Sequence, residues 1–428
     1  MSASYPDEHQ QTIWNTSVNV IGPVFLFFVW WTLQEAQRRG IKRLYFLARD
    51  GQVLLDIANL IKESGHFDID CRYLYGSRQS WLTSSVKTVG KSELKWIMSD
   101  WWYPLSIDSV CRRMGFKPEE LGNFFEHNGF PSDHYKELLN SDQKQRLIQC
   151  LQSVAFGELY LKYKQEDQSN MLGYLRQEGI FDNEAYGLVD IGWRGNQQLT
   201  LNKILKTEDA LPKNGITGFY LGLTESVHKI ESDTLLGFLF DLSSSSKRIY
   251  LRNNHIYEAF TAGLDGRVIK FRSADGKFYP AMAEVNQKLI EWGVGIQREG
   301  ILKFAKEFMA HAPAASMAQE NYYPVLEKIM YKFINTPSLS EAQVYGQFPM
   351  DGEMTESRVQ EIAPVITRRQ FWQSCINLKD FRLYWIQSVF IRSHLWVEYN
   401  LWKIILPVIA YSFYLMIKCL KLIGISPL

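Results

Sequence analysis

The segment at residues 188–200, Leu-Val-Asp-Ile-Gly-Trp-Arg-Gly-Asn-Gln-Gln-Leu-Thr, constrains the fold of this chain most strongly. Its apolar start predicts a buried strand that ends at Asp190, and its end predicts a helix. Gly192 and Gly195 lie between them, and glycine tolerates the backbone conformations of a sharp turn. A helix that begins directly after a strand directs free N–H groups at an anion, usually phosphate. The segment therefore predicts an anion site at the carboxyl edge of a sheet, with Arg194 inside the turn.

Other segments predict further strands of the same sheet. Residues 42–48 predict a strand, residues 52–64 an amphipathic helix and residues 71–75 a second strand. This succession of strand, loop, helix and strand indicates a parallel α/β sheet. The remaining strands are expected at residues 186–190, 215–223 and 237–240.

An apolar helix is expected before the first strand, over residues 23–39. Its apolar run at residues 24–31 is too short to cross a bilayer, so we interpret it as a buried helix on the sheet. Residues 1–11 are polar and show no signal peptide, and the five cysteines form no Cys-x-x-Cys pair. A reducing cytosol is therefore the expected compartment.

The rest of the chain predicts mainly helices. The stretch from 91 to 179 contains no convincing strand, and its helices are expected at residues 92–100, 118–128, 133–139 and 142–173. Helices are again expected after residue 284, apart from a looser stretch at residues 335–356. The predicted organisation is an α/β core at residues 12–90 and 180–283, a helical insertion at 91–179, a helical region at 284–367 and a basic aromatic tail at 368–428.

The tail at residues 368–428 differs from the rest of the chain in charge. The whole chain carries a net charge of +1, which gives no nucleic-acid signal, whereas the tail has eight basic and two acidic residues. Its residues 404–417 are uncharged and lie between Lys403 and Lys418. Since a spanning helix needs roughly 20 residues, the tail predicts a helix lying in a membrane interface. The alternative is a helix packed on the protein's own core.

Three loops that follow three predicted strands each contain an arginine. They lie at residues 48–51, 76–79 and 190–196. In a parallel sheet these loops emerge at one edge, where ligands bind, and arginine matches the geometry of phosphate. An aspartate there can hold ribose hydroxyls, bind a metal or accept a proton. The alternative is that Asp50 and Asp190 cap helices, with the arginines as their surface partners.

The same segments resemble one bacterial protein family. The matching sequences are Gly-Pro-Val-Phe-Leu-Phe-Phe-Val at 22–29, the stretch ending in Ala-Arg-Asp-Gly at 40–51, Tyr-Leu-Tyr-Gly-Ser-Arg at 73–78 and Val-Asp-Ile-Gly-Trp-Arg-Gly at 189–195. They resemble proteins from capsule and O-antigen gene clusters, which are often labelled as hydrolases of the haloacid dehalogenase type. That group is similar to type I phosphoribosyltransferases and includes polysaccharide ribofuranosyltransferases. The resemblance covers about residues 14–270.

The resemblance implies a fold and a reaction. The fold is an α/β, parallel-sheet, phosphoribosyltransferase-like (Rossmann-like) core with a helical insertion and a mainly helical C-terminal region. The reaction transfers 5-phosphoribose from 5-phosphoribosyl 1-diphosphate (PRPP) to a lipid-linked glycan acceptor, inverts to a β-linkage and releases pyrophosphate. A separate phosphatase partner then removes the 5-phosphate. The protein is expected in the cytoplasm, peripheral at the inner face of the cytoplasmic membrane, where anionic lipids attract the basic tail.

The resemblance also implies roles for individual residues. Asp50 is the expected general base, with a contact to ribose or magnesium as its alternative role, and Asp190 is expected to face the ribose hydroxyls. Magnesium is expected to arrive on the donor diphosphate rather than in a protein cage, with Asp50 or Asp190 as an added ligand. Ordinary phosphoribosyltransferases have two adjacent acids here, whereas Asp190 is followed by Ile191. The expected donor-binding residues are Arg49, Gly51, Ser77, Arg78, Gly192, Trp193, Arg194, Gly195, Asn196 and Gln197. From the residues alone, Glu258 is a candidate near the acceptor or a solvated helix residue.

Two other functions stay open. A phosphatase of the haloacid dehalogenase type needs an Asp-x-Asp pair after its first strand, and Asp50-Gly51-Gln52 lacks the second acid. A non-catalytic membrane scaffold of a polysaccharide assembly complex would account for the tail but leaves the three arginine loops unexplained. A Rossmann dinucleotide enzyme needs an early Gly-x-Gly-x-x-Gly, which the chain lacks. The expected function remains the one that the family resemblance implies, the PRPP-dependent transfer.

Overall fold

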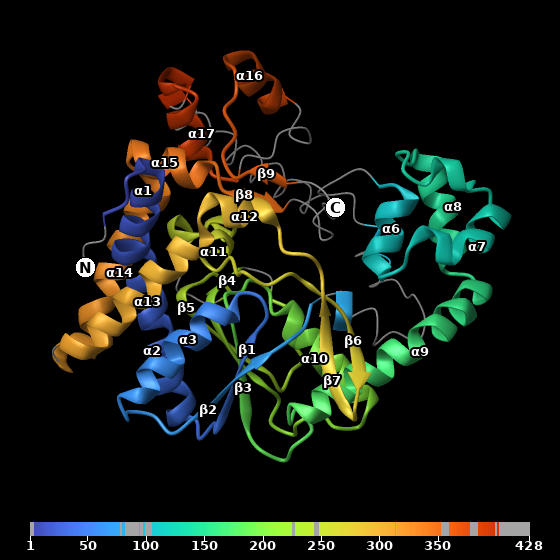
Figure 1. Ribbon diagram of the computed structural model, residues 1–428, viewed down its shortest axis with the longest axis horizontal. Helices are drawn as coiled ribbons and strands as arrows, with labels where there is room; N and C mark the ends of the chain where they lie inside the picture. The colour runs from blue at the N-terminus through green and yellow to red at the C-terminus, as the bar shows by residue number, and fades with distance from the viewer. Residues whose placement is uncertain are drawn as a thin grey trace, which may run out of the picture.

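Five parallel strands form the centre of the protein, in the order β2-β1-β3-β4-β5 (Figure 1). The computed structural model describes residues 4–77, 79–81, 94, 97–98, 105–224, 227–243, 248–312, 314–351, 359–376, 384–398 and 400–401. The strands are β1 (Arg43–Leu47), β2 (Asp70–Leu74), β3 (Tyr186–Asp190), β4 (Thr217–Leu223) and β5 (Thr234–Asp241). The expected α/β class, the parallel sheet and all five expected strands are thus confirmed.

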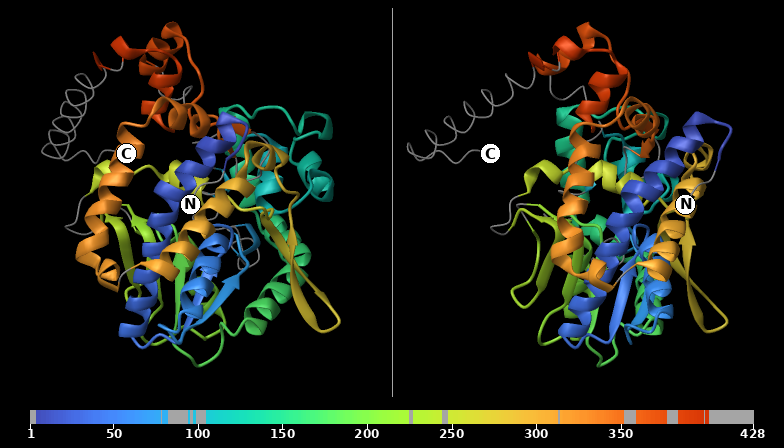
Figure 2. Two further views of the ribbon diagram at one scale, coloured as in Figure 1. Left: turned by 60° about the vertical axis from the view of Figure 1, so that its left-hand side comes forward. Right: turned by 90° about the vertical axis from the view of Figure 1, so that its left-hand side faces the viewer.

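Successive side chains of a strand point to opposite sides, so each face of the sheet has its own apolar side chains. Different helices cover the two faces. Leu44 and Phe46 of β1 lie in a hydrophobic cluster with α2 and α3, whereas Tyr45 and Leu47 lie in another cluster with α9 and α10. Figure 2 shows the layers from two further directions. The helices are α2 (Gly22–Arg38), α3 (Gly51–Glu63), α9 (Val154–Gln177) and α10 (Asn196–Thr207). Helices on both faces explain why β1 and β3 are buried along their whole length.

The direction in which strands are added reverses between β1 and β3. From β1 the chain passes through α3 to β2 on one side, and from β3 it passes through α10 to β4 on the other side. Since α3 and α10 cover opposite faces, the chain leaves the carboxyl ends of β1 and β3 toward opposite faces of the sheet. Ligands of open α/β sheets bind at such a switch point. The fold therefore identifies the loops after β1 and β3 as the candidate ligand site.

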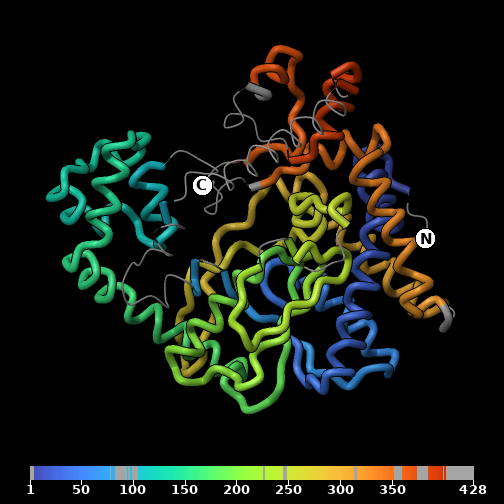
Figure 3. The backbone as a smooth tube through the Cα atoms, turned by 180° about the vertical axis from the view of Figure 1, so that it is seen from behind, coloured from blue at the N-terminus to red at the C-terminus, as the bar shows by residue number. Residues whose placement is uncertain are grey.

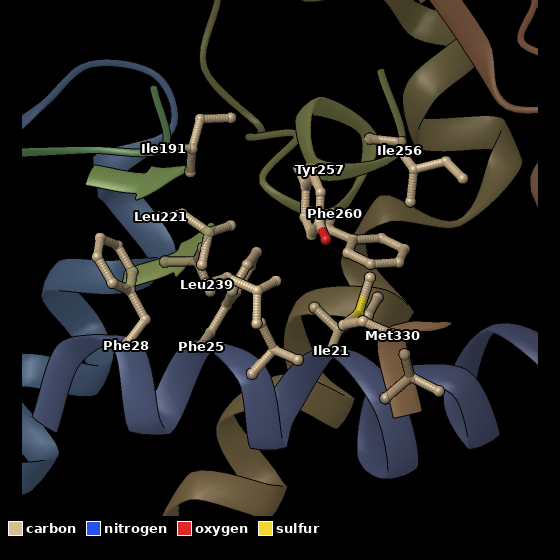
Figure 4. Close-up of a cluster of buried hydrophobic side chains, with 14 of the residues drawn as sticks. Ile21, Phe25, Phe28, Ile191, Leu221, Leu239, Ile256, Tyr257, Phe260 and Met330 are labelled. Atoms are coloured by element: carbon tan, nitrogen blue, oxygen red, sulfur yellow. The ribbon is translucent and has the colours of Figure 1, made fainter. Parts of the chain in front are cut away.

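A long N-terminal helical segment packs on the sheet. It comprises α1 (Glu8–Thr16), a π-helical turn (Ser17–Ile21) and α2, so it begins well before the expected helix at 23–39. Among the described residues, Glu8–Arg38 is long and apolar enough to cross a membrane, and 89% of its most apolar window is buried within the protein. Phe25 and Phe28 are directed at Leu221 and other sheet residues (Figure 4). The expected helix at 23–39 and its burial are therefore confirmed, whereas the helical segment that precedes it was not expected.

The chain between β2 and β3 forms a helical lobe (Figure 3). Buried apolar side chains of this lobe form a hydrophobic core of their own. Its helices are α6 (Ile107–Met114), α7 (Gly122–His127), α8 (Ser141–Leu151) and the first part of α9. The expected helix at 133–139 is only a 3₁₀ turn at Ser132–His134, and the expected helix at 142–173 is divided. Ser153 causes the division, because its hydroxyl accepts the N–H of Phe156 at 3.1 Å and caps α9. The expected helix at 92–100 lies mostly outside the described residues.

A hairpin that the sequence analysis missed follows the sheet. Strands β6 (Val268–Ala274) and β7 (Lys277–Met282) pair antiparallel and pack on α9, where Phe271 stacks on Tyr174 with 4.5 Å between ring centroids. Asp275 and Gly276 connect them with φ of 51° and 74°. Asp-Gly with two positive φ values is typical of a tight hairpin turn, so this dipeptide was the available signal.

The remaining chain is mainly helical, as expected, and includes one helix in the stretch that was expected to be loose. That helix is α15, whose first turn is closed by Ser338 and Glu341 in a reciprocal capping box. The elements are α11 (Asn254–Phe260), α12 (Gln287–Trp292), α13 (Val294–His311), α14 (Gln319–Asn335), α15 (Leu339–Gly346), β8 (Pro349–Asp351), β9 (Val359–Glu361), α16 (Arg368–Ile376) and α17 (Ile386–Arg392).

Arg43 connects three acidic side chains at the amino edge of the sheet. It is 8% exposed, and its guanidinium lies 2.9 Å from both Asp70 and Asp182 and 3.1 Å from Glu184. Arg43→Met keeps the apolar part of the side chain but removes the guanidinium and its contacts with the three carboxylates. We therefore expect the free energy of unfolding to fall by about 2 kcal/mol. The half-exposed carboxylates regain water, which limits the loss. Urea denaturation measures the change, and Arg38→Met, at an exposed position, is the control. Equal midpoints for the two variants would contradict the assigned role of Arg43.

Candidate functional site

The loop after β1 is held to α11 by a short hydrogen bond. Thr261, directly after α11, donates its hydroxyl to Asp50 Oδ1 at 2.6 Å. Gly51 begins α3 so close to β1 that a Cβ there would lie 2.6 Å from the carbonyl carbon of Phe46. Only glycine therefore fits at position 51, and the close approach places the half-buried Asp50 directly over the end of β1. The neighbouring Arg49 is exposed.

Charged and phenolic side chains surround the same loop. Burial raises the pKa of Tyr73 at the end of β2, the negative charges of Asp265 and Asp50 raise it further, and the positive charge of Arg49 lowers it. The Tyr73 hydroxyl therefore stays a neutral hydrogen-bond donor at neutral pH. Gln52 donates to Asp265 Oδ2 at 2.7 Å and so fixes that carboxylate beside the loop.

The loop after β3 makes the sharp turn that its glycines predict. Gly192 has a φ of 140°, and a Cβ there would lie 2.3 Å from the carbonyl oxygen of Gly222 on β4. Gly195 has a φ of 72° and precedes α10, whose first turn is capped by no described side chain. Asp190 is 5% exposed, and its Oδ1 accepts the N–H of Ile191 at 2.8 Å. The Asp190 carboxylate therefore stabilises the turn through a hydrogen bond to the backbone of the turn itself. The peptide bond after Gly192 is cis, as is the one before Arg49.

Helix α11 connects the loops after β1 and β3. Glu258 and Thr261 are three residues apart, so they lie on one helix face. Trp193 Nε1 donates to Glu258 Oε1 at 3.0 Å, while Thr261 binds Asp50. His255 Nδ1 lies 3.3 Å from Glu258 Oε2. The structure thus brings Asp50, Trp193 and Glu258 together at the switch point of the sheet.

Arg194 is directed toward the connection between β4 and β5. Its Nη2 lies 2.9 Å from His228 Nε2, and since arginine can only donate, Nε2 must accept. His228 Nδ1 therefore carries the hydrogen and donates it to Asn196 Oδ1 at 2.7 Å, which makes the ring neutral. Arg49, in contrast, acts on Tyr73 of β2. The two arginines thus lie in the loops that follow β1 and β3, the two strands at the switch point.

The remaining predicted residues have structural partners or lie outside the described chain. Ser77 is buried, and its hydroxyl donates to the carbonyl oxygen of Val268 at 2.7 Å, which ties the loop after β2 to β6. Gln197 is half-buried in the first turn of α10. Arg78 lies outside the described residues.

Sequence reasoning missed Thr261, Asp265 and His228. The spacing of Glu258 and Thr261 on one predicted helix face was a usable signal for Thr261. Asp265 and His228 carry no such signal, because each lies in a connecting segment and reaches the site only through tertiary packing.

Comparison with family models finds no match for this chain. Comparison with curated proteins also finds no related sequence. Within the described residues, no group of three or more His, Cys, Asp or Glu side chains is arranged to hold a metal ion. The functional argument therefore depends on the geometry at the switch point.

Proposed function

We propose that this protein is a glycosyltransferase that moves 5-phosphoribose from PRPP to a hydroxyl of a lipid-linked glycan. The reaction releases pyrophosphate and inverts the α donor to a β-linked product, and a partner phosphatase then removes the 5-phosphate. One observation carries the proposal: α11 binds Asp50 after β1 at 2.6 Å through Thr261, and Trp193 after β3 at 3.0 Å through Glu258. These contacts build a polar site at the edge where α/β sheets bind phosphorylated ligands.

Each end of the donor has a matching partner in the proposal. The loop from Gly192 to Asn196 and the first turn of α10 bind the 5-phosphate through backbone N–H groups. The exposed Arg49 binds the pyrophosphate. Magnesium bound to the donor diphosphate would supply positive charge to the leaving group, with Asp50 as the residue that could add a ligand.

The acids have different roles in the proposed reaction. Asp50, oriented by the Thr261 hydroxyl, accepts the proton of the attacking acceptor hydroxyl. Glu258, held by Trp193, contacts the acceptor from the other loop. Asp190 is a positioning residue, because it is buried and bonded to the N–H of Ile191 within its own turn.

The test is incubation of the full chain with PRPP, magnesium and a panel of lipid-linked glycans. Pyrophosphate release that depends on the acceptor supports the proposal. Arg49→Ala is expected to weaken donor binding roughly 10- to 100-fold, since a hydrogen bond to a charged group contributes about 1.5–3 kcal/mol. Isothermal calorimetry with PRPP measures this loss, and Arg38→Ala, on the exposed end of α2, is the control.

Two outcomes would overturn the proposal. Phosphate release from sugar phosphates would favour a phosphatase, although Gln52 stands where such an enzyme needs its second acid, and its amide binds Asp265 and Arg298. Absence of donor binding and of turnover across the panel would favour a scaffold.

A further inference from the structure

The C-terminal helices present apolar side chains to solvent. Five of them are 39–63% exposed: Val365, Trp372, Trp396, Val397 and Leu401. We call these five residues the C-terminal apolar surface. Exposed single apolar residues are ordinary, but a group with two tryptophans in a short part of the chain indicates an interaction site.

Contacts between two segments make this group one surface. Arg368 on α16 forms an ion pair with Glu398, which adjoins Val397. Ile366 N–H donates to Ser393 Oγ at 3.0 Å, and the rings of Phe371 and Phe390 lie 5.2 Å apart. The segment around α16 and the segment after α17 are thus fixed side by side.

Residue spacing places the exposed side chains on shared helix faces. Trp372 follows Arg368 by one helical turn, and Leu401 follows Val397 by the same interval. The ion pair between Arg368 and Glu398 therefore lies between the exposed Trp372 of one segment and the exposed Val397 and Leu401 of the other.

The charge around this surface is positive. Arg368 and Arg369 are exposed, whereas Glu398 is buried against Arg368, and Glu361 is bound by Arg392 at 2.8 Å. The sequence then continues with an uncharged stretch at 404–417 that is bounded by lysines. Basic residues beside exposed tryptophans are the combination that binds anionic membrane surfaces.

We propose that the C-terminal apolar surface docks on an anionic lipid bilayer. The two tryptophans lie at the level of the headgroups, and Arg369 contacts a lipid phosphate. This inference does not depend on the transferase activity, because it concerns binding alone.

The same surface is connected to the candidate site. Tyr384, just before α17, packs on His255 with 4.0 Å between ring centroids, and its carbonyl oxygen accepts from Asn253 at 3.2 Å. In Figures 1 and 2, α16 and α17 lie beyond α11 on the side of the sheet where the strands end. Docking through this surface therefore brings the bilayer to the side of the molecule that carries the site.

The test measures co-sedimentation of the full chain with vesicles. We expect the wild type to bind vesicles that contain phosphatidylglycerol at least 10-fold more tightly than vesicles of phosphatidylcholine alone, and less tightly at high salt. The double variant Trp396→Ser/Val397→Ser is expected to bind the anionic vesicles roughly 10-fold more weakly. Its matched control is Val325→Ser/Tyr331→Ser, which removes two similarly exposed apolar side chains of α14.

A charge variant gives a second, independent readout. Arg369→Glu reverses one exposed charge and is expected to reduce binding to anionic vesicles roughly 10-fold, without an effect on neutral vesicles. Circular dichroism and thermal melting check that each variant folds as the wild type does.

Three outcomes would overturn the inference. The first is wild-type binding by both the Trp396→Ser/Val397→Ser and Arg369→Glu variants. The second is no preference of the wild type for anionic vesicles. The third is a wild-type dimer that the double variant converts to a monomer without a change in vesicle binding, because a second copy of the chain would then occupy the surface.

Discussion

Asp50→Asn is expected to lower acceptor-dependent pyrophosphate release by roughly 10²- to 10⁴-fold, the range lost with a general base. Asparagine has nearly the same shape, and its Oδ1 can still accept the Thr261 hydroxyl that lies 2.6 Å away in the wild type. The loop after β1 should therefore keep its position, and only proton acceptance is lost. Steady-state kinetics should show the loss in kcat, while calorimetry shows donor affinity within a few-fold of the wild type.

Two further variants separate chemistry from structure. Asp68→Asn changes an exposed aspartate before β2 and is the control for loss of one carboxylate. Thr261→Val removes the hydroxyl that orients Asp50, so it should reduce turnover less than Asp50→Asn does. A fully active Asp50→Asn variant would refute the assigned role. A large loss in Glu258→Gln alone would then assign proton transfer to Glu258.

The sheet could be predicted because its strands carry strong local signals. β1 and β3 are mostly apolar, and each is followed by a turn that contains glycine, so both could be recognised as strands. Because parallel strands end at one edge, the positions of Asp50 and Trp193 at that edge also followed from the sequence. The helix that precedes α2 did not follow from the sequence, since Glu8–Thr16 is mostly polar and shows no clear apolar face.

Side-chain direction was the part that the sequence could not determine. Arg194 lies in the predicted turn, but its guanidinium meets His228, a residue that only the β4–β5 connection brings near. Asp190 ends the predicted strand, but its carboxylate bonds within its own turn. A pattern of residue types locates a loop at an edge, whereas the partner of each side chain depends on segments far away in the sequence.

Gly192→Ala is the most direct test of the loop after β3. With φ at 140° and a Cβ 2.3 Å from the backbone oxygen of Gly222, alanine cannot be accommodated unless β3, β4 or the turn moves. We expect a loss of about 2–3 kcal/mol in the free energy of unfolding. We also expect donor binding to weaken at least 10-fold, because the N–H groups that follow Gly192 are displaced.

The matched control for this substitution is Gly157→Ala. Gly157 lies in the first part of α9, and a Cβ there would meet no atom within 4 Å. Alanine should therefore stabilise the helix by about 0.5–1 kcal/mol and leave donor binding unchanged. If both variants melted at the wild-type temperature and bound PRPP equally well, the close packing of Gly192 on β4 would not shape a donor site. If Gly192→Ala lost stability but kept full affinity, the turn would be structural, and the 5-phosphate would have to bind elsewhere along the edge.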